Sequence, residues 1–147
     1  MGLTLQKRLG ELFTALDVTC RQEVLDLEVC GVTDDSRQVQ PGMLFVAVTG
    51  DTVDRHRFIN AAVAGGCAAV LASRDYTEAC AVPVITVADT AAALGHVAAA
   101  FFDYPCRRLK MIGITGTNGK TTCTYLLEGL IRATGGSPGV IGTVSIR

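Results

Sequence analysis

The stretch Gly-Ile-Thr-Gly-Thr-Asn-Gly-Lys-Thr-Thr at residues 113–122 decides the fold of this chain. It follows an apolar run at residues 109–114, which predicts a buried strand, and it leads into residues 121–134, which predict a helix. A strand, a glycine-rich turn and a helix in this order can bind phosphate, because backbone N–H groups at the turn and the helix N-terminus point at the anion. In such a site Lys120 reaches the β- and γ-phosphates of a nucleotide, and the Thr121 hydroxyl binds Mg²⁺.

The glycine spacing departs from the general phosphate-loop pattern G-x-x-x-x-G-K-[ST]. With Gly119 as the second glycine, the pattern requires a glycine at position 114, where this chain has isoleucine. The glycines are at Gly113 and Gly116 instead. The alternative is a strand-to-helix turn that binds no ligand. We favour the phosphate site, because Gly-Lys-Thr-Thr at a helix start is hard to explain by packing alone.

Composition narrows the classes of protein. The chain has 147 residues, of which 49% are hydrophobic, and its mean hydropathy is +0.37, as expected for a globular chain with a buried core. The net charge of −1 gives no basic surface for nucleic acid, and no apolar run reaches the roughly 18 residues that a membrane span needs. The N-terminus lacks the apolar core and cleavage site of a signal peptide. We expect a cytoplasmic monomer.

The six cysteines do not follow a metal-binding or disulfide pattern. They are separated by ten or more residues throughout, and no C-x-x-C pair occurs. Most lie in apolar or strand-like segments, where a free thiol behaves as a small hydrophobic group. We expect buried, reduced thiols at Cys20, Cys30, Cys67, Cys80, Cys106 and Cys123.

Helical and strand patterns alternate along the chain, which is typical of an α/β architecture with a largely parallel sheet. A polar break with Pro105 and Arg107-Arg108 predicts a domain boundary, so that residues 1–108 and 109–147 form separate domains. The predicted helices are 3–16, 57–64, 89–102 and 121–134, and the predicted strands are 29–33, 43–48, 67–72, 82–87, 109–114 and 140–146.

Two separated motifs resemble those of the Mur ligases. T-G-T-N-G-K-T-T at residues 115–122 resembles the ATP loop of these enzymes and of their folylpolyglutamate synthetase relatives. D-S-R-Q-V-Q-P-G-M-L-F-V-A-V-T-G at residues 35–50 is similar to the N-terminal domain shared by the two Mur ligases that add the third residue and the terminal dipeptide of the peptidoglycan stem. Thr117-Asn118 and G-V-I-G-T at residues 139–143 look like the enzyme that adds the third residue. The resemblance covers residues 25–147.

The resemblance implies an α/β fold in which a UDP-binding domain precedes a parallel-sheet ATPase domain. It also implies a reaction in which ATP phosphorylates the D-glutamate carboxylate of UDP-MurNAc-L-Ala-D-Glu. The amine of a diamino acid, meso-diaminopimelate or lysine, then displaces phosphate. Lys120 is the catalytic residue by this resemblance, and Thr121 the ligand of Mg²⁺. The implied ATP contacts are Gly116, Thr117, Asn118, Gly119, Lys120, Thr121 and Thr122.

The resemblance also assigns the uridine end of the substrate to the N-terminal motif. Ser36 and Asp34 lie at the uridine site by matching position, and Asp51, Thr52 and Val53 line the same pocket. The alternative for residues 35–37 is a turn in which a side chain caps backbone N–H groups.

The chain departs from the family pattern just after these loop residues. The family often has Asp-Gly-His where this chain has Asp54-Arg55-His56, and arginine tolerates a positive φ poorly. For His56 we favour a role in a turn or helix cap over a role as catalytic base.

The family's remaining catalytic and amino-acid-binding parts lie in segments that would follow residue 147. We therefore expect this chain to be the N-terminal part of such a ligase and to be inactive alone. The alternatives are a stand-alone nucleotide-sugar binding module without catalysis, and a fragment of the Mur ligase that adds the terminal dipeptide.

Overall fold

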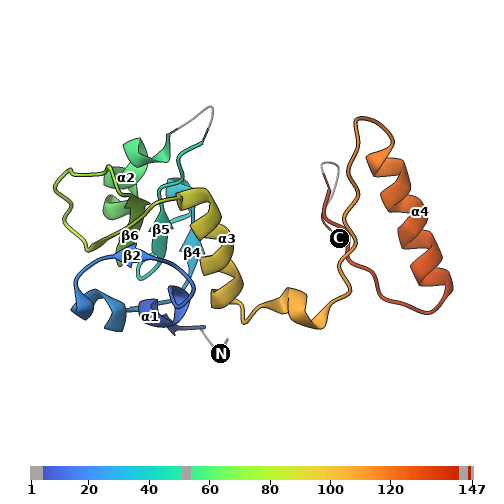
Figure 1. Ribbon diagram of the computed structural model, residues 1–147, viewed down its shortest axis with the longest axis horizontal. Helices are drawn as coiled ribbons and strands as arrows, with labels where there is room; N and C mark the ends of the chain where they lie inside the picture. Colours follow the sequence, from blue (N-terminus) through green and yellow to red (C-terminus); the bar gives the residue numbers. More distant parts are fainter. Residues whose placement is uncertain (1–4, 51–53, 143–145, 147) are drawn as a thin grey trace. The chain divides into compact units, whose positions relative to one another are not determined.

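The computed structural model describes residues 5–50, 54–142 and 146. The chain divides into two compact units, Met1–Arg108 and Leu109–Arg147 (Figure 1). Among the described residues, the first unit contains all the paired strands and three α-helices, and the second contains one long helix. No helix within the described ranges is long and apolar enough to cross a membrane.

The first unit is built on a five-stranded sheet with the order β2-β7-β6-β5-β4. Four neighbouring strands are parallel, with Val32 opposite Leu44 and Val70 opposite Val84, whereas β2 runs antiparallel to β7. A separate antiparallel pair joins β1 and β3. The strands are β1 (Lys7–Arg8), β2 (Val18–Thr19), β3 (Glu28–Val29), β4 (Val32–Thr33), β5 (Leu44–Val46), β6 (Ala69–Ser73) and β7 (Val84–Val87).

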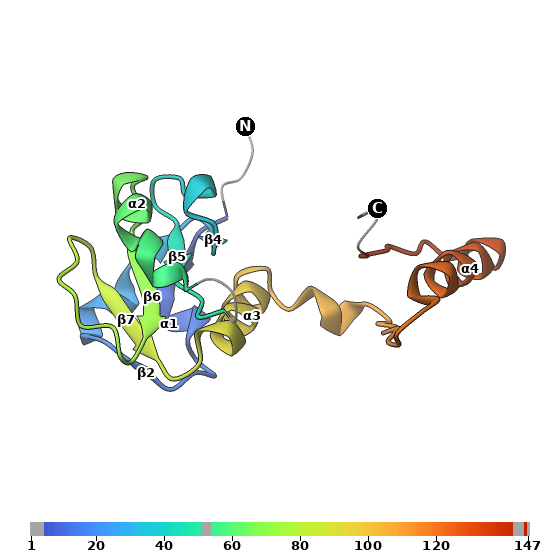
Figure 2. The ribbon, with the colours of Figure 1, turned by 90° about the horizontal axis from the view of Figure 1, so that it is seen from above.

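Helices cover both faces of this sheet, as a parallel sheet requires (Figure 2). Leu44, Val46 and Leu71 point into a core that also holds buried residues of α1 and α3, whereas Phe45 and Val70 pack on the other face with α2. The α-helices are α1 (Leu9–Leu12), α2 (Ile59–Ala64), α3 (Thr90–Phe101) and α4 (Lys120–Ala133). Short 3₁₀ segments are η1 (Gln22–Asp26), η2 (Ser36–Gln38), η3 (Arg55–Phe58) and η4 (Pro105–Arg108).

Local sequence signals set the ends of the central elements. Asp89 caps α3, because its carboxylate accepts a hydrogen bond of 2.9 Å from the backbone N–H of Ala92. Gly66 follows α2 with a φ of +88°, a conformation that favours glycine. The predicted helices at 57–64 and 89–102 and the strands at 43–48, 67–72 and 82–87 are confirmed, with ends shifted by one or two residues.

Two predictions near the N-terminus are wrong. Of the described residues in the predicted helix at 3–16, only Leu9–Leu12 are helical, and Lys7 and Arg8 instead pair with β3 as a strand. The predicted strand at 29–33 is two strands in different sheets, with Gly31 between them. A Cβ atom at Gly31 would lie 2.5 Å from Cε of Met43, so any larger residue there would have to displace the methionine side chain.

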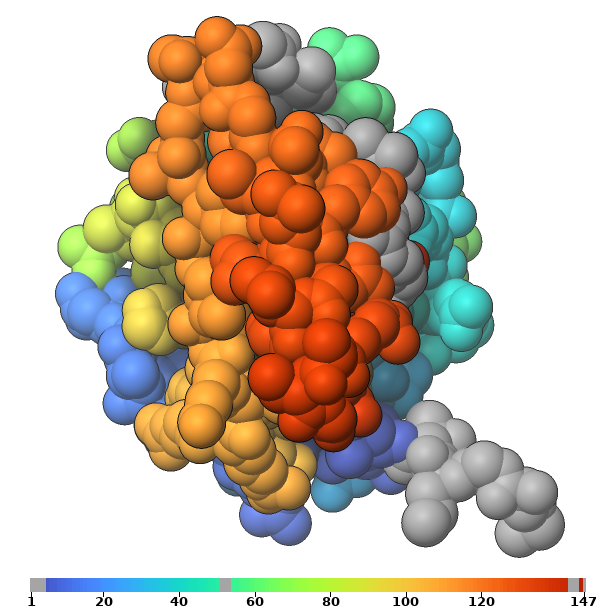
Figure 3. Space-filling view, turned by 90° about the vertical axis from the view of Figure 1, so that its right-hand side faces the viewer, coloured from blue at the N-terminus to red at the C-terminus, as the bar shows by residue number. Residues whose placement is uncertain are grey.

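The described residues of the second unit contain the predicted helix but neither predicted strand. Residues 109–114 form no strand, and Leu109, Met111 and Ile112 are 63%, 69% and 60% exposed. Residues 140–146 contribute an isolated bridge between Ile141 and Ile146, and residues 143–145 lie outside the described part. A strand forms only beside a hydrogen-bonded neighbour, and the described residues of this unit supply none. The surface of α4, orange to red in Figure 3, is likewise largely exposed.

All six cysteines are free thiols, as expected, but their expected burial is only partly correct. Cys67 is buried in the core against α2, and burial raises the pKa of its thiol. Cys20, Cys30 and Cys80 are half-buried, and the remaining two, Cys106 and Cys123, are exposed. Cys106 lies in η4 and Cys123 on the exposed surface of α4, so neither packs in a hydrophobic core.

We expect Leu71→Ala to lower the free energy of unfolding of the first unit by about 3 kcal/mol, because it empties a fully buried site in the central strand. Urea unfolding followed by the amide NMR signals of the sheet measures this change. Leu126→Ala is the control, since Leu126 is 64% exposed on α4 and its loss should leave these signals unchanged. Equal unfolding midpoints for both variants would contradict the assigned core.

Candidate functional site

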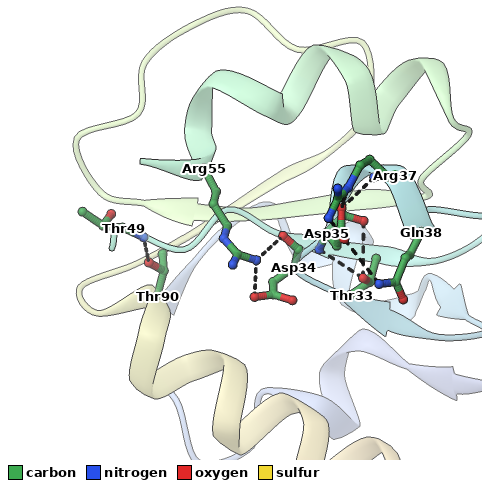
Figure 4. Close-up of polar contacts among 8 residues, drawn as sticks. All are labelled: Thr33, Asp34, Asp35, Arg37, Gln38, Thr49, Arg55 and Thr90. Atoms are coloured by element: carbon green, nitrogen blue, oxygen red, sulfur yellow. Dashed lines mark hydrogen bonds and ion pairs between the residues drawn. The ribbon is translucent and has the colours of Figure 1, made fainter. Parts of the chain in front are cut away.

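The candidate site of the first unit lies where the parallel strands end. The turn after β4, the loop after β5, the segment after β6 and the start of α3 follow the carboxyl ends of neighbouring strands. In open α/β sheets this edge is where ligands bind. Figure 4 shows the polar contacts in this region: Thr90 with Thr49, Arg55 with Asp34, and the hydrogen bonds of Asp35 within its own turn.

The turn after β4 is held by the carboxylate of Asp35. It accepts hydrogen bonds from the backbone N–H of Arg37 at 3.0 Å and from the Arg37 guanidinium at 2.9 and 2.7 Å. The backbone N–H of Asp35 donates to the hydroxyl of Thr33 at 3.1 Å, and the side-chain amide of Gln38 donates to the Asp35 carboxylate at 3.3 Å. The Arg37 guanidinium, followed by the Arg37 backbone N–H, holds the pKa of Asp35 far below the usual carboxyl range.

The capping of this turn leaves Ser36 available. Asp35, not Ser36, is the residue whose side chain caps η2. Ser36 is half-buried, and its hydroxyl has no hydrogen-bond partner among the residues that the structure describes. Capping and ligand binding were alternatives for residues 35–37, and the structure shows the capping role, which belongs to Asp35.

Arg55 joins the loop after β5 to the turn after β4. Its Nη1 donates to the backbone carbonyl of Asp34 at 2.6 Å and forms a close ion pair with the Asp34 carboxylate (Figure 4). Its backbone N–H donates to the carbonyl of Val48 at 3.1 Å. In the described ranges only Asp103 and Tyr104 are non-glycine residues with a positive φ. Arg55 therefore replaces the family's glycine without backbone strain.

His56 connects η3 to the end of β6. Its Nε2 accepts a hydrogen bond of 2.9 Å from the backbone N–H of Ser73, so Nδ1 carries the proton and donates to Asp54 at 2.6 Å. The Asp54 carboxylate also accepts from the backbone N–H of His56, which is the main reason that the pKa of Asp54 is lowered. Both ring nitrogens thus serve the fold, which confirms the expected role of His56 in a turn.

The loop after β5 is also tied to α3. The backbone N–H of Thr49 donates to the buried hydroxyl of Thr90 at 3.0 Å (Figure 4). The three substrate residues predicted in this loop, Asp51, Thr52 and Val53, lie outside the described residues.

A hollow of about 600 Å³ opens beside this loop, but its lining includes neither Asp34 nor Ser36. It carries the carboxyl groups of Asp54, Asp75, Glu78 and Asp89. Four carboxylates repel a diphosphate, so the geometry favours the turn after β4 over the hollow as the place for an anionic nucleotide.

The glycine-rich loop of the second unit, predicted to bind phosphate, has the backbone shape that its glycines allow. Gly116 and Gly119 have φ values of +143° and +76°, and Gly119 directly precedes the first residue of α4. Nothing lies within 4 Å of a Cβ atom built at Gly119, so conformation, not crowding, calls for glycine there. The Nζ of Lys120 donates to the carbonyl of Gly116 at 2.5 Å, which holds the lysine over the loop.

The predicted site residues therefore fall in two places. Asp34 and Ser36 are neighbours in the turn after β4, and Gly116 through Thr122 lie together around the start of α4 in the second unit. The sequence did not reveal the partner of Asp34, because Arg55 was notable there only as the residue that replaces a glycine of the family pattern. Because β4 and β5 are neighbours in the sheet, the segments that follow them lie close together, and this adjacency could have indicated that Asp34 and Arg55 are partners.

Comparisons with known proteins agree with the resemblance to the Mur ligases. A family model described as "Mur ligase family, catalytic domain" matches residues 28–102. The UDP-N-acetylmuramoyl-L-alanyl-D-glutamate–2,6-diaminopimelate ligase of Oceanobacillus iheyensis is 40% identical over 141 residues, and that of Gloeobacter violaceus 42% over 142 residues. These matches cover 96% and 95% of this chain, which spans only 28% of the length of each relative.

Solved structures of related ligases share the fold. MurF from Acinetobacter baumannii superposes with a TM-score of 0.66 at 27% identity, over 89% of this chain and 28% of that protein. MurF from Thermotoga maritima in complex with ADP matches 69% of this chain and 23% of that protein, with a TM-score of 0.50 at 28% identity.

The parallel sheet and the lysine-bearing glycine loop at a helix start define an α/β protein. Because the family model covers half of the chain and the relatives match nearly all of it, the chain belongs to the Mur ligase family. The resemblance inferred from the two sequence motifs is confirmed.

We expect Arg37→Ala to raise the pKa of Asp35 toward the usual carboxyl range, because the guanidinium is the largest cause of its lowering. The pKa should remain below that range, since the backbone N–H at position 37 still donates. The carboxyl ¹³C shift of Asp35 followed against pH measures this. A lowered pKa stabilises the fold above the unfolded carboxyl value, and this stability is lost as the pH falls through the folded value, so the variant should lose less stability in acid.

The matched control for this titration is Gln38→Ala, which removes a lesser contact to the same carboxylate. It should raise the pKa of Asp35 by a smaller amount. A titration of Asp35 that does not change in Arg37→Ala would contradict the assigned cause.

Proposed function

We propose that this chain is the N-terminal part of an ATP-dependent ligase that joins a diamino acid to UDP-MurNAc-L-Ala-D-Glu in peptidoglycan precursor synthesis. One observation carries the proposal: identity near 40% extends over both units, with relatives named as ligases of that substrate and 2,6-diaminopimelate. The relatives' names favour diaminopimelate over lysine as the added residue. Because the chain spans 28% of their length, the activity of the whole protein is an inference.

In this proposal the unit Met1–Arg108 binds the UDP end of the substrate. The turn after β4 supports this role, because it lies at the carboxyl ends of the parallel strands, where ligands bind in open α/β sheets. Asp35 caps this turn, so the Ser36 hydroxyl is available for a ligand. Asp34 flanks Ser36. The other residues assigned to the pocket, Asp51, Thr52 and Val53, follow Thr49 on the neighbouring loop.

The unit Leu109–Arg147 begins the ATP-binding domain in this proposal. The N-terminus of the 14-residue α4 and the backbone N–H groups of residues 116–122 suit the charge of a triphosphate. Lys120 offers its ammonium group to the phosphate that is transferred, and Thr121 is suited to hold Mg²⁺ through its hydroxyl. Bound Mg²⁺ would neutralise phosphate charge during transfer.

The chemistry then consists of two displacements. The D-glutamate carboxylate takes the γ-phosphoryl group, which releases ADP and gives an acyl phosphate. The amine of the diamino acid attacks the acyl carbon, an amide bond forms, and inorganic phosphate leaves together with the proton of the amine. Lys120 balances negative charge in the first step. The free thiols suit the reducing cytoplasm in which we place this reaction.

A second candidate is the Mur ligase that adds the terminal dipeptide, because the solved structures that superpose on this chain include MurF proteins at 27% and 28% identity. The higher identity of the diaminopimelate ligases favours the first proposal. Tighter binding of the UDP-muramoyl tripeptide than of the dipeptide would favour the second candidate instead.

We expect Ser36→Ala to weaken binding of UDP-MurNAc-L-Ala-D-Glu about fivefold, the effect of one lost hydrogen bond between neutral groups. Isothermal titration calorimetry with the chain measures the affinity. Thr14→Ala is the control, because it removes an exposed hydroxyl that bonds only the nearby carbonyl of Glu11 at 3.3 Å. Equal affinities for wild type and Ser36→Ala would refute the uridine assignment.

We expect Lys120→Ala to weaken ATP binding at least about tenfold, because a charged hydrogen bond to phosphate is lost. Fluorescence titration with an ATP analogue in the presence of Mg²⁺ measures this. Affinity for the UDP-muramoyl dipeptide should not change, and Lys110→Ala, an exposed lysine of the same unit, should leave both affinities unchanged. Retained ATP affinity in Lys120→Ala would contradict the assigned phosphate loop.

A further inference from the structure

Arg55 contacts the residue that lies two positions before Ser36. A single guanidinium nitrogen, Nη1, contacts both the backbone carbonyl and the carboxylate of Asp34 (Figure 4). Such a two-point contact fixes the side chain and the main chain of Asp34 together. The backbone N–H of Arg55 is itself anchored on Val48, just after β5. Arg55 therefore spans the gap between two neighbouring parallel strands at their carboxyl ends.

The remaining side-chain hydrogen bonds of this turn are internal. Thr33 bonds Asp35, and Asp35 bonds Arg37 and Gln38, all within residues 33–38. Among the described residues, the contact from Arg55 is the side-chain hydrogen bond that ties the turn to another segment. Without it the turn keeps its internal hydrogen bonds but loses its side-chain link to Arg55.

Charge gives the contact a second consequence. Asp34 and Asp35 precede Ser36 directly, and each carboxylate is paired with an arginine: Asp34 with Arg55, and Asp35 with Arg37. The turn is therefore neutral although it carries two carboxylates. The side chains of Asp34 and Arg55 are each 37% exposed, so the pair is only partly screened by water. An unpaired Asp34 would repel a nucleotide diphosphate at Ser36.

We propose that Arg55 is a positioning residue for the nucleotide end of the substrate, which acts through Asp34 by holding the Ser36 turn in place and by cancelling the Asp34 charge. This role rests on the proposed function of the first unit. The glycine that the family often has at this position offers neither contact. The inference thus concerns a feature of this chain's own sequence.

Arg55→Ala tests the role by calorimetry of the chain with UDP-MurNAc-L-Ala-D-Glu. We expect affinity to fall about tenfold, because both the contact to the turn and the charge balance are lost. Arg55→Lys keeps the charge and a donor, and it should bind within about threefold of wild type. Arg132→Ala is the matched control: two guanidinium nitrogens of Arg132 contact the Glu128 carboxylate on α4 in the other unit, and their loss should leave affinity unchanged.

The double variant Asp34→Asn/Arg55→Ala separates action through Asp34 from direct contact with the ligand. If Arg55 acts through Asp34, removing the carboxylate charge restores part of the affinity lost in Arg55→Ala. Equal affinities of the double variant and Arg55→Ala would overturn the proposal, as would wild-type affinity in Arg55→Ala. Amide NMR spectra of each variant establish that it is folded. Failure of the wild-type chain to bind the ligand would contradict the proposed function itself.

Discussion

The parallel pairing of β4, β5, β6 and β7 is the constraint on which the rest of the first unit depends. Parallel strands expose hydrophobic side chains on both faces, and here alternate residues of β5 and β6 enter two separate cores. Neither core forms unless helices cover both faces, so α2 must pack on one side and α1 and α3 on the other. The same pairing sets all four carboxyl ends at one edge. The edge at which ligands bind in open α/β sheets is thus set by the same strand pairing that buries the two cores.

Loops at that edge are held by polar contacts that reach across neighbouring strands. His56 joins η3 to the end of β6, Thr90 binds the loop after β5 from α3, and Arg55 joins that loop to the turn after β4. Each contact uses a backbone group on one side, so it fixes the main chain as well as the side chain. In the proposed function such contacts would support binding, because a rigid turn presents Ser36 at lower entropic cost than a mobile one.

The sequence predicted what local chemistry determines. The apolar runs of β5, β6 and β7, the aspartate cap of α3, and the Gly-Lys-Thr start of α4 were each identified from their own residues. The failures all involve distant partners. Residues 7–8 left the predicted N-terminal helix because β3 pairs with them, and residues 109–114 formed no strand because no described residue pairs with them. The hydrophobic periodicity of a sequence indicates which residues can be buried. It does not indicate which other segment of the chain covers them.

Arg55 illustrates the same limit within the site. From the sequence, replacing a family glycine by arginine suggested a strained loop, because glycine usually marks a positive φ. The structure has no positive φ at this position, so arginine fits there without backbone strain. What the substitution adds is a side chain, and the order of the strands sets Asp34 within its reach. A residue that departs from its family's pattern is therefore better judged by what its side chain contacts than by the conformation that the family residue allows.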